Sequence, residues 1–460
     1  MFIFFICKMF FYSLYVGRFP DEICHISYIA TLVKDNVIIP NFKSMRILQL
    51  VHASSATTDF AKSGTYIFGQ SLNYLGHPPL YYQIMRLSGG IAVNNNIVTV
   101  NMFNLRLFNM GISALSMLLI FYLGYSRIGK SRLMHLLYAT IVVSVPMLSY
   151  VSAGINDDNL SLLCVTIFIF GLIRFSEHKQ NYLTFALISV GVTAAFLTKF
   201  TAGTIIAFSL VFFLLFYLIK NKNLNFLKTK QFLVTIPIYL IFIAYYVSIY
   251  LQTHSIQPTY KVLDPQGFYS SGFFIQPSQR IDMSFIVYIK TFLGNFFGTW
   301  IGIASHVDLL KYGSIFSIQK SALLSLCVLP LLLLWKFKKS DELYTLKSAI
   351  ISIYFSIVVT VSIQVLRAYY EYKNVSGYLG GFQARYYLCT ISAIALAIVF
   401  FSRSIYESES KKHLKLSFGN EIISLPIKKV VFGLICVVFV GLLFYEDFIY
   451  FLIYFKDYLK

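Results

Sequence analysis

The chain has 460 residues, of which 57% are hydrophobic and only 12% are charged. A soluble domain carries about 25% charged residues, so this composition excludes a soluble enzyme and indicates a polytopic membrane protein. The net charge of +19 comes from lysines and arginines scattered over short segments between apolar runs, a pattern typical of cytoplasmic anchors facing anionic lipid and not of a nucleic-acid surface.

Apolar runs of spanning length predict an all-α fold with about eleven transmembrane helices. They lie near residues 1–17, 107–125, 133–151, 159–174, 182–198, 201–219, 232–251, 321–335, 348–366, 386–402 and 430–449. No small-residue cleavage site follows the first run, so we expect a retained span and not a signal peptide. Because this run is short and contains Lys8, the natural chain is expected to begin a few residues upstream.

Basic residues set the expected orientation. With the N-terminus in the cytoplasm, Lys and Arg are about threefold denser in the inside loops than outside, as the positive-inside rule requires. Two long segments, 18–106 and 252–320, then lie outside. The amphipathic stretches 23–33 and 81–87 and a segment near 284–300 are expected to form helices along the membrane surface. We expect one transmembrane domain over 1–402, followed by a cytoplasmic loop and a last span over 403–460.

The acidic pair Asp21-Glu22 follows the first span directly, after Pro20. Carboxylates are costly near lipid, so these two are either solvated or functional. One interpretation is a cap that favours the N-terminus of a helix. The other is a general base that takes a proton from an acceptor hydroxyl or amine as it attacks a phosphate-activated sugar. Cys24-His25 adds a second titratable side chain, the role of which is open.

His77 precedes Pro78-Pro79 and Tyr81-Tyr82, where the prolines fix the backbone at a helix start. His77 is either an ordinary interfacial residue or a donor to a phosphate or sugar oxygen. The turn that holds Asp157 and Asp158 is either a capping turn or an acidic wall that binds acceptor hydroxyls.

Two cations are expected at the outer ends of spans. Lys199 is either a snorkelling side chain or the partner of an anionic headgroup. Arg385 offers a planar fork suited to phosphate, and Arg106 is a weaker candidate of the same kind. The six cysteines show no CxxC spacing and are expected to be free thiols in apolar surroundings.

These motifs resemble those of the GT-C class of membrane glycosyltransferases, which includes the dolichyl-phosphate-mannose protein mannosyltransferases and the bacterial aminoarabinose transferases. The similar pieces, best over 15–210 and again over 380–390, are Asp21-Glu22, His77 to Tyr82, Asn156 to Asp158, Thr198-Lys199 and Gln383 to Tyr386. At His77 the chain departs from the aminoarabinose transferases, which usually have Lys.

The resemblance implies an inverting glycosyltransferase at the outer membrane face, with a polyprenyl-phosphate-linked sugar as donor and a lipid, glycan or protein as acceptor. It also implies site roles: Asp21 as base, Glu22 assisting it or binding the acceptor, donor-phosphate binding by His77, Lys199 and Arg385, and acceptor binding or cavity lining by Asp157, Asp158, Tyr81 and Tyr82. We expect no required cofactor or metal, because no dense carboxylate cluster is present, and a bacterial inner membrane as the location.

Two other functions fit a polytopic chain. A sugar or lipid transporter often shows repeated halves and polar breaks at mid-membrane, and neither is visible in this sequence. A non-catalytic subunit of glycan assembly or export would leave the outer carboxylates facing solvent and not a shared cavity.

Overall fold

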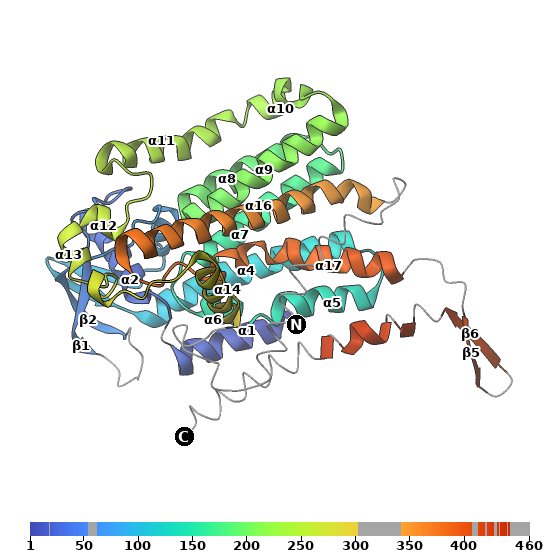
Figure 1. Ribbon diagram of the computed structural model, residues 1–460, viewed down its shortest axis with the longest axis horizontal. Helices are drawn as coiled ribbons and strands as arrows, with labels where there is room; N and C mark the ends of the chain where they lie inside the picture. Colours follow the sequence, from blue (N-terminus) through green and yellow to red (C-terminus); the bar gives the residue numbers. More distant parts are fainter. Residues whose placement is uncertain are drawn as a thin grey trace.

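The computed structural model describes residues 1–17, 19–53, 62–301 and 342–406, together with 413–418, 421–426 and short stretches between 430 and 441. Figure 1 shows long helices running side by side, with a small sheet and several loops gathered at one end of the bundle. The hairpin of β5 (His413–Phe418) and β6 (Glu421–Pro426) projects from the opposite end.

The predicted all-α polytopic membrane fold is confirmed. Within the described residues six helices are long and apolar enough to cross a membrane, or seven if one bent pair counts as a single span. The spans predicted at 321–335 and, for the most part, 430–449 lie outside the described residues, so the total of eleven stays a prediction. The helices in the bundle are α1 (Phe2–Phe11), α4 (Met102–Ile128), α5 (Arg132–Val143), α6 (Pro146–Ala153), α7 (Asp158–Ser176), α8 (Tyr182–Thr198), α9 (Phe200–Asn221), α10 (Lys230–Leu233), α11 (Ile236–Thr253), α16 (Glu342–Glu371) and α17 (Ile391–Tyr406).

Local sequence explains several helix ends. The side chains of Asn101, Ser131 and Asn181 each accept a hydrogen bond from a backbone N–H in the first turn of α4, α5 and α8, which satisfies a donor that the helix leaves without a partner. Pro146 begins α6, and the α5–α6 pair bends there by 58°, because proline cannot continue the hydrogen-bond ladder of a preceding helix.

Helix α7 lies at the centre of the bundle, where it packs against α4, α8 and α16. Its close approach to α8 depends on glycine. A Cβ atom on Gly191 of α8 would come within 2.8 Å of the backbone of Phe168 in α7. This tight seam fixes the start of α7 and the end of α8, and both carry site residues.

The first outer segment combines helices with a sheet that sequence analysis did not predict. Helices α2 (Glu22–Asp35) and α3 (Leu80–Arg86) occupy the predicted amphipathic stretches. Between and after them, β1 (Arg46–Ala53), β2 (Gly64–Leu72), β3 (Ile91–Asn94) and β4 (Ile97–Val100) form an antiparallel sheet of order β1-β2-β4-β3. Because α2 packs against β1, β3 and α3, most of its side chains are buried.

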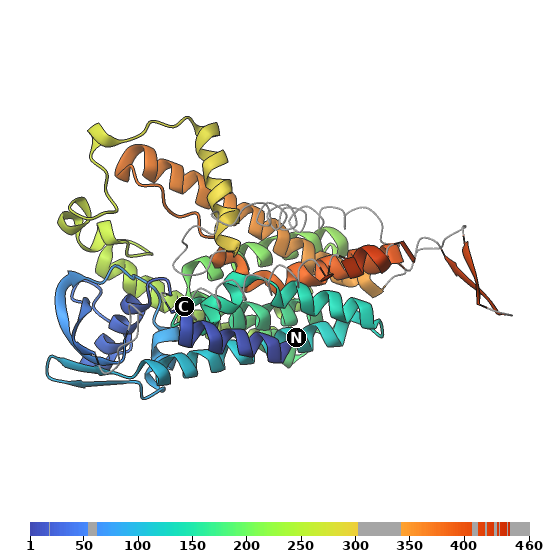
Figure 2. The same cartoon turned by 90° about the horizontal axis from the view of Figure 1, so that it is seen from below.

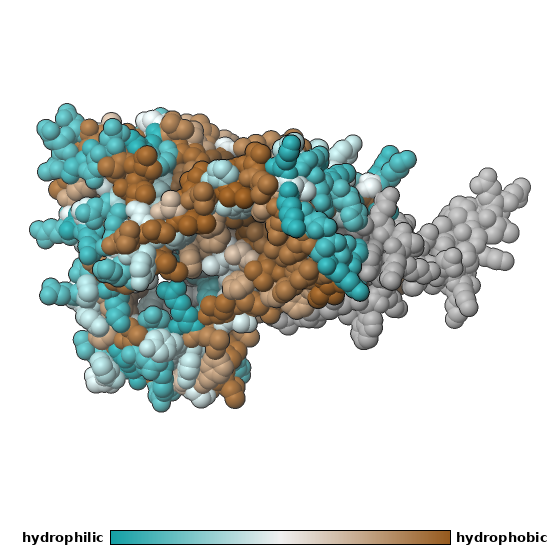
Figure 3. Space-filling view, turned by 90° about the horizontal axis from the view of Figure 1, so that it is seen from above, coloured by the Kyte–Doolittle hydropathy of each residue, from teal (hydrophilic) through white to brown (hydrophobic). Residues whose placement is uncertain are grey.

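The second outer segment contributes the short helices α12 (Tyr260–Leu263) and α13 (Pro265–Tyr269), followed by α14 (Phe285–Ile301) where a surface helix was predicted. Figure 2 shows α14, in yellow, running across the direction of the bundle. In Figure 3 a band of apolar side chains covers the middle of the molecule between hydrophilic surfaces at its two ends, as a bundle that spans a membrane requires.

Candidate active site

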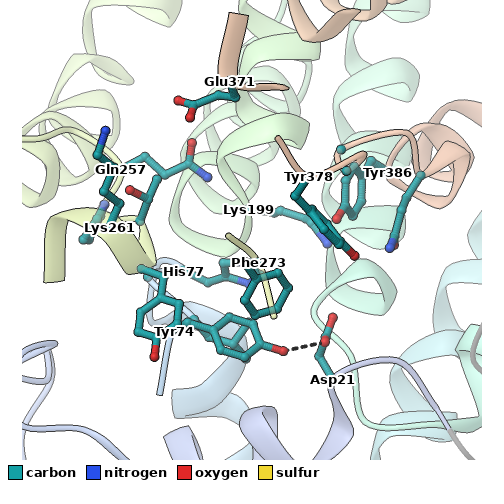
Figure 4. A pocket seen from close by; sticks show the side chains of 18 of the residues that line it. Asp21, Tyr74, His77, Lys199, Gln257, Lys261, Phe273, Glu371, Tyr378 and Tyr386 are labelled. Carbon is teal, nitrogen blue, oxygen red and sulfur yellow. Dashed lines mark hydrogen bonds between the residues drawn. The ribbon is translucent and has the colours of Figure 1, made fainter. Parts of the chain in front are cut away.

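A cavity of about 460 Å³ opens at the end of the bundle that carries the sheet. Its walls come from the start of α2, the segment before α3, the turns before α7 and α9, the second outer segment, the end of α16 and the segment before α17. Figure 4 shows side chains from these distant parts of the chain converging on one space. The lining includes Asp21, His25, Tyr74, His77, Asp157, Lys199, Gln257, Lys261, Phe273, Arg367, Glu371, Tyr378 and Arg385.

Asp21 stands at the N-terminus of α2 in a left-handed conformation, with φ of 56°. The hydroxyl of Tyr74 donates to Oδ1 at 2.8 Å, and Nη2 of Arg385 lies 3.2 Å from Oδ2. Burial raises the pKa of Asp21, but the charge of Arg385 and the Tyr74 hydrogen bond outweigh that effect and hold the pKa below its ordinary value. Asp21 is therefore an ionised carboxylate, and its side chain keeps 35% of its exposure toward the cavity.

The two acids of the 156–159 turn surround Lys199. Its ammonium donates to Oδ1 of Asp157 at 2.9 Å and to Oδ1 of Asp158 at 2.6 Å. Burial lowers the pKa of Lys199, yet these carboxylates reverse the effect and leave the pKa raised. For Asp157, burial raises the pKa, and Lys199 followed by His77 brings it well below its usual range. Lys199 and Asp157 are thus charged, and the side chain of Lys199 keeps only 7% of its exposure.

His77 lies on the same wall as Asp157. Its Nδ1 is 2.6 Å from Oδ2 of Asp157. The backbone carbonyl of His77 accepts a hydrogen bond from Tyr28 at 3.0 Å, which fixes the turn before α3. Of its side chain, 24% remains exposed, so the ring can reach a bound molecule.

A buried aromatic layer supports this wall. Nδ1 of His25 and the hydroxyl of Tyr82 are hydrogen-bonded at 2.9 Å, and the Tyr82 ring stacks on Tyr28 with centroids 3.7 Å apart. The hydroxyl of Tyr81 donates to Oδ1 of Asn109 at 2.8 Å. Tyr81 and Tyr82 are fully buried and, like Asp158, are not among the lining residues. Burial lowers the pKa of His25 to about 3.

Glu22 turns away from the cavity that Asp21 faces. Its carboxylate accepts hydrogen bonds from Nε and Nη2 of Arg106 at 3.0 and 2.7 Å. It also accepts one from the backbone N–H of Ile155 at 3.0 Å. With 3% of its side chain exposed, Glu22 joins the start of α2 to α4 and to the acidic turn before α7. Arg106, a weaker phosphate candidate in the sequence, is thus committed to this pair. The predicted catalytic role of Glu22 stays a prediction.

Sequence reasoning missed several polar and charged lining residues, among them Tyr74, Gln257, Lys261, Arg367 and Glu371. Arg367 and Glu371 carried a usable signal, because two charged residues one helical turn apart mark the end of a span. Tyr74, by contrast, resembles many other tyrosines in the chain, and its bond to Asp21 depends on tertiary structure alone.

A second cavity, of about 520 Å³, adjoins the first. It runs between α9 and α16 with a mainly apolar surface, to which Phe200, Phe208 and Ile363 contribute. It shares Gln257, Arg367 and Glu371 with the polar cavity. A polar chamber therefore continues into an apolar groove.

No group of three or more His, Cys, Asp or Glu side chains in the described part of the chain is arranged to hold a metal ion. That a metal is not required stays a prediction from the sequence.

Comparisons with known proteins give three findings. Residues 76–248 match the family described as dolichyl-phosphate-mannose-protein mannosyltransferase. Two solved structures of ArnT from Cupriavidus metallidurans are similar: the apo state, with a TM-score of 0.38 and 10% identity over 94% of this chain and 83% of that one, and the form bound to undecaprenyl phosphate, with a TM-score of 0.36 and 11% identity over 94% and 84%. Among curated proteins, no sequence matches. From residue 76 to residue 248 this membrane protein therefore carries the sequence pattern of the dolichyl-phosphate-mannose-protein mannosyltransferase family, as its motifs predicted.

Proposed function

We propose that this protein is an inverting membrane glycosyltransferase that moves a sugar from a polyprenyl-phosphate donor to an acceptor at the outer face of a bacterial inner membrane. One observation carries the proposal: Asp21 is ionised, partly exposed and oriented by two neighbours inside a cavity at the end of the bundle away from the basic loops. The family match over 76–248 and the apolar groove beside the cavity support it, since an isoprenoid carrier needs both a polar and an apolar compartment.

In this mechanism Asp21 accepts the proton of the acceptor hydroxyl or amine as that group attacks the anomeric carbon. The bond from this carbon to the phosphate oxygen breaks, and its electron pair leaves with the phosphate. Arg385 and Tyr74 hold the Asp21 carboxylate in place, so the protein supplies position and fixed charge. The transferred sugar is a hexose or pentose, and the acceptor is a lipid, a glycan or a protein.

The test replaces Asp21 with asparagine, which keeps the size of the side chain and removes the base. We expect transfer of radiolabelled sugar from polyprenyl-phosphate donors, measured in membrane fractions, to fall by about a hundredfold or more, with normal insertion and yield. Asp35→Asn, an exposed acid at the end of α2, serves as the matched control. Near-normal transfer by Asp21→Asn would remove the base assignment and favour a non-catalytic subunit.

A further inference from the structure

We propose that the phosphate of the lipid donor is held by Arg367 and Lys261, at the junction of the polar cavity and the apolar groove, and not by Lys199 or Arg385. The inference rests on the proposed glycosyl transfer. It assigns the two charged ends of the reaction to opposite walls of one chamber, with the base on one wall and the leaving phosphate on the other.

The first argument is the charge balance around Lys199. Its ammonium contacts two carboxylates, Asp157 and Asp158, and its side chain is almost fully buried. Arg385 is likewise placed among acids, with Nη2 3.2 Å from Asp21 and Nε 3.6 Å from Asp158. Two cations thus face three carboxylates, so this cluster has no positive charge left over to attract a phosphate.

The second argument is the geometry of the displacement. Inversion requires the attacking oxygen and the departing phosphate oxygen to lie on opposite sides of the anomeric carbon. A cation bonded directly to the base therefore stands on the attacking side. Nη1 of Arg385 lacks a hydrogen-bond partner among the described residues, and a group bound to it would be the acceptor, because Arg385 already holds Asp21.

The opposite wall has the charges that the leaving group needs. Arg367 is exposed near the end of α16, and its Nη1 donates to Oε1 of Gln257 at 3.2 Å, which links α16 to the second outer segment. Lys261, on α12, makes no hydrogen bond or ion pair to any other described residue. Figure 4 shows Gln257, Lys261 and Glu371 across the chamber from Asp21.

The position of Arg367 also suits the binding of a donor with a long isoprenoid chain. Arg367 lines both the polar cavity and the groove between α9 and α16. A carrier with its isoprenoid chain in that groove brings its phosphate to the Arg367 end of the chamber, with the sugar extending toward Asp21. Arginine offers a planar fork for phosphate oxygens.

Bond cleavage increases the negative charge that these two cations face. The donor phosphate is a diester with one negative charge, and the released carrier phosphate is a monoester that gains a second when the electron pair leaves with the oxygen. Cations at this place therefore stabilise the phosphate more in the transition state than in the bound donor, and this difference is what accelerates the reaction. Glu371 lies one turn beyond Arg367 and lines the same two cavities, so its negative charge opposes phosphate binding.

The experiment compares the binding of decaprenyl phosphate and the neutral alcohol decaprenol to the full-length protein in nanodiscs, by native mass spectrometry. We expect Arg367→Ala and Lys261→Ala each to weaken phosphate binding by about tenfold without affecting the alcohol. Arg367→Lys is expected to lose less, and Glu371→Gln to bind the phosphate several-fold more tightly. Lys290→Ala, an exposed cation on α14 that lines neither cavity, is the matched control.

The outcomes separate this inference from the function on which it rests. If the unaltered protein binds decaprenyl phosphate and decaprenol equally, the lipid-phosphate donor, and with it the proposed function, fails. If it prefers the phosphate but Arg367→Ala, Lys261→Ala and Glu371→Gln all keep that preference unchanged, the assignment to this wall is overturned while the function stands. Because Glu371→Gln is expected to gain affinity, misfolding cannot imitate the predicted pattern.

Discussion

His25 makes acid stability depend on a single buried ring. Burial lowers the pKa of His25 from 6.5 to about 3, so the folded protein keeps it neutral where the unfolded chain would protonate it. This contribution to stability is complete above pH 6.5 and is lost as the pH falls from 6.5 toward 3, by about 1.4 kcal/mol per pH unit. We therefore expect the melting temperature of the detergent-purified protein to decrease between pH 6.5 and 4.5.

That window isolates His25 from the carboxylates. The lowered pKa values of Asp21 and Asp157 contribute stability that disappears only below their ordinary value of 3.8. In His25→Gln the melting temperature should vary less between pH 6.5 and 4.5 than in the unaltered protein, whereas His52→Gln, at an exposed position in β1, should keep the full dependence. An unchanged slope in His25→Gln would show that its ring does not control acid stability.

Residue types and their order along the chain predicted much of the site, but not the pairing between side chains. Asp21, His77, Asp157, Lys199 and Arg385 were all expected near one cavity, and all five line it. The partners of Glu22 could not be predicted, because Arg106 lies 84 positions away and any outer cation was an equal candidate. Only the fold decides which of two adjacent acids faces the cavity and which is buried.

At the scale of elements, hydropathy located the helices of the bundle because each must bury its own backbone polar groups within lipid. The sheet of the first outer segment was missed, since it lies outside that constraint and its strands pair across long separations, as Arg46 does with Leu72. The β3–β4 hairpin was the visible exception. Two asparagines connect its short apolar strands, and Asn95 adopts the positive φ that such a turn needs.

Gly76 lies directly against Pro258, where the two outer segments meet. A Cβ atom at Gly76 would lie 1.9 Å from the carbonyl oxygen of Pro258, and backbone cannot yield as a flexible side chain does. We expect Gly76→Ala to separate the second outer segment from the His77 turn and to reduce sugar transfer by about tenfold to a hundredfold. Limited proteolysis within 255–283 should become faster.

Gly272 provides the comparison for this change, because a Cβ atom there meets nothing within 4 Å. Gly272→Ala lies in the second outer segment, which also holds Pro258, and should leave both transfer and proteolysis unchanged. If Gly76→Ala behaves like Gly272→Ala, the contact between Gly76 and Pro258 does not hold the cavity together.

For the whole molecule, the arrangement of its two ends predicts its orientation. The cavity lies with the sheet at one end, and the basic connection between α9 and α11 lies at the other. Because basic loops remain in the cytoplasm, we expect the site to face outward. A membrane-impermeant maleimide should then label Asn95→Cys, in the β3–β4 turn, on intact cells, and Asn223→Cys only after permeabilisation.

Both variants are built in a Cys7→Ala background, because Cys7 is exposed while Cys24, Cys164, Cys389 and Cys436 are buried. The background protein without either new cysteine gives the reference signal. Labelling of Asn223→Cys, and not Asn95→Cys, on intact cells would place the cavity in the cytoplasm and contradict transfer at the outer face.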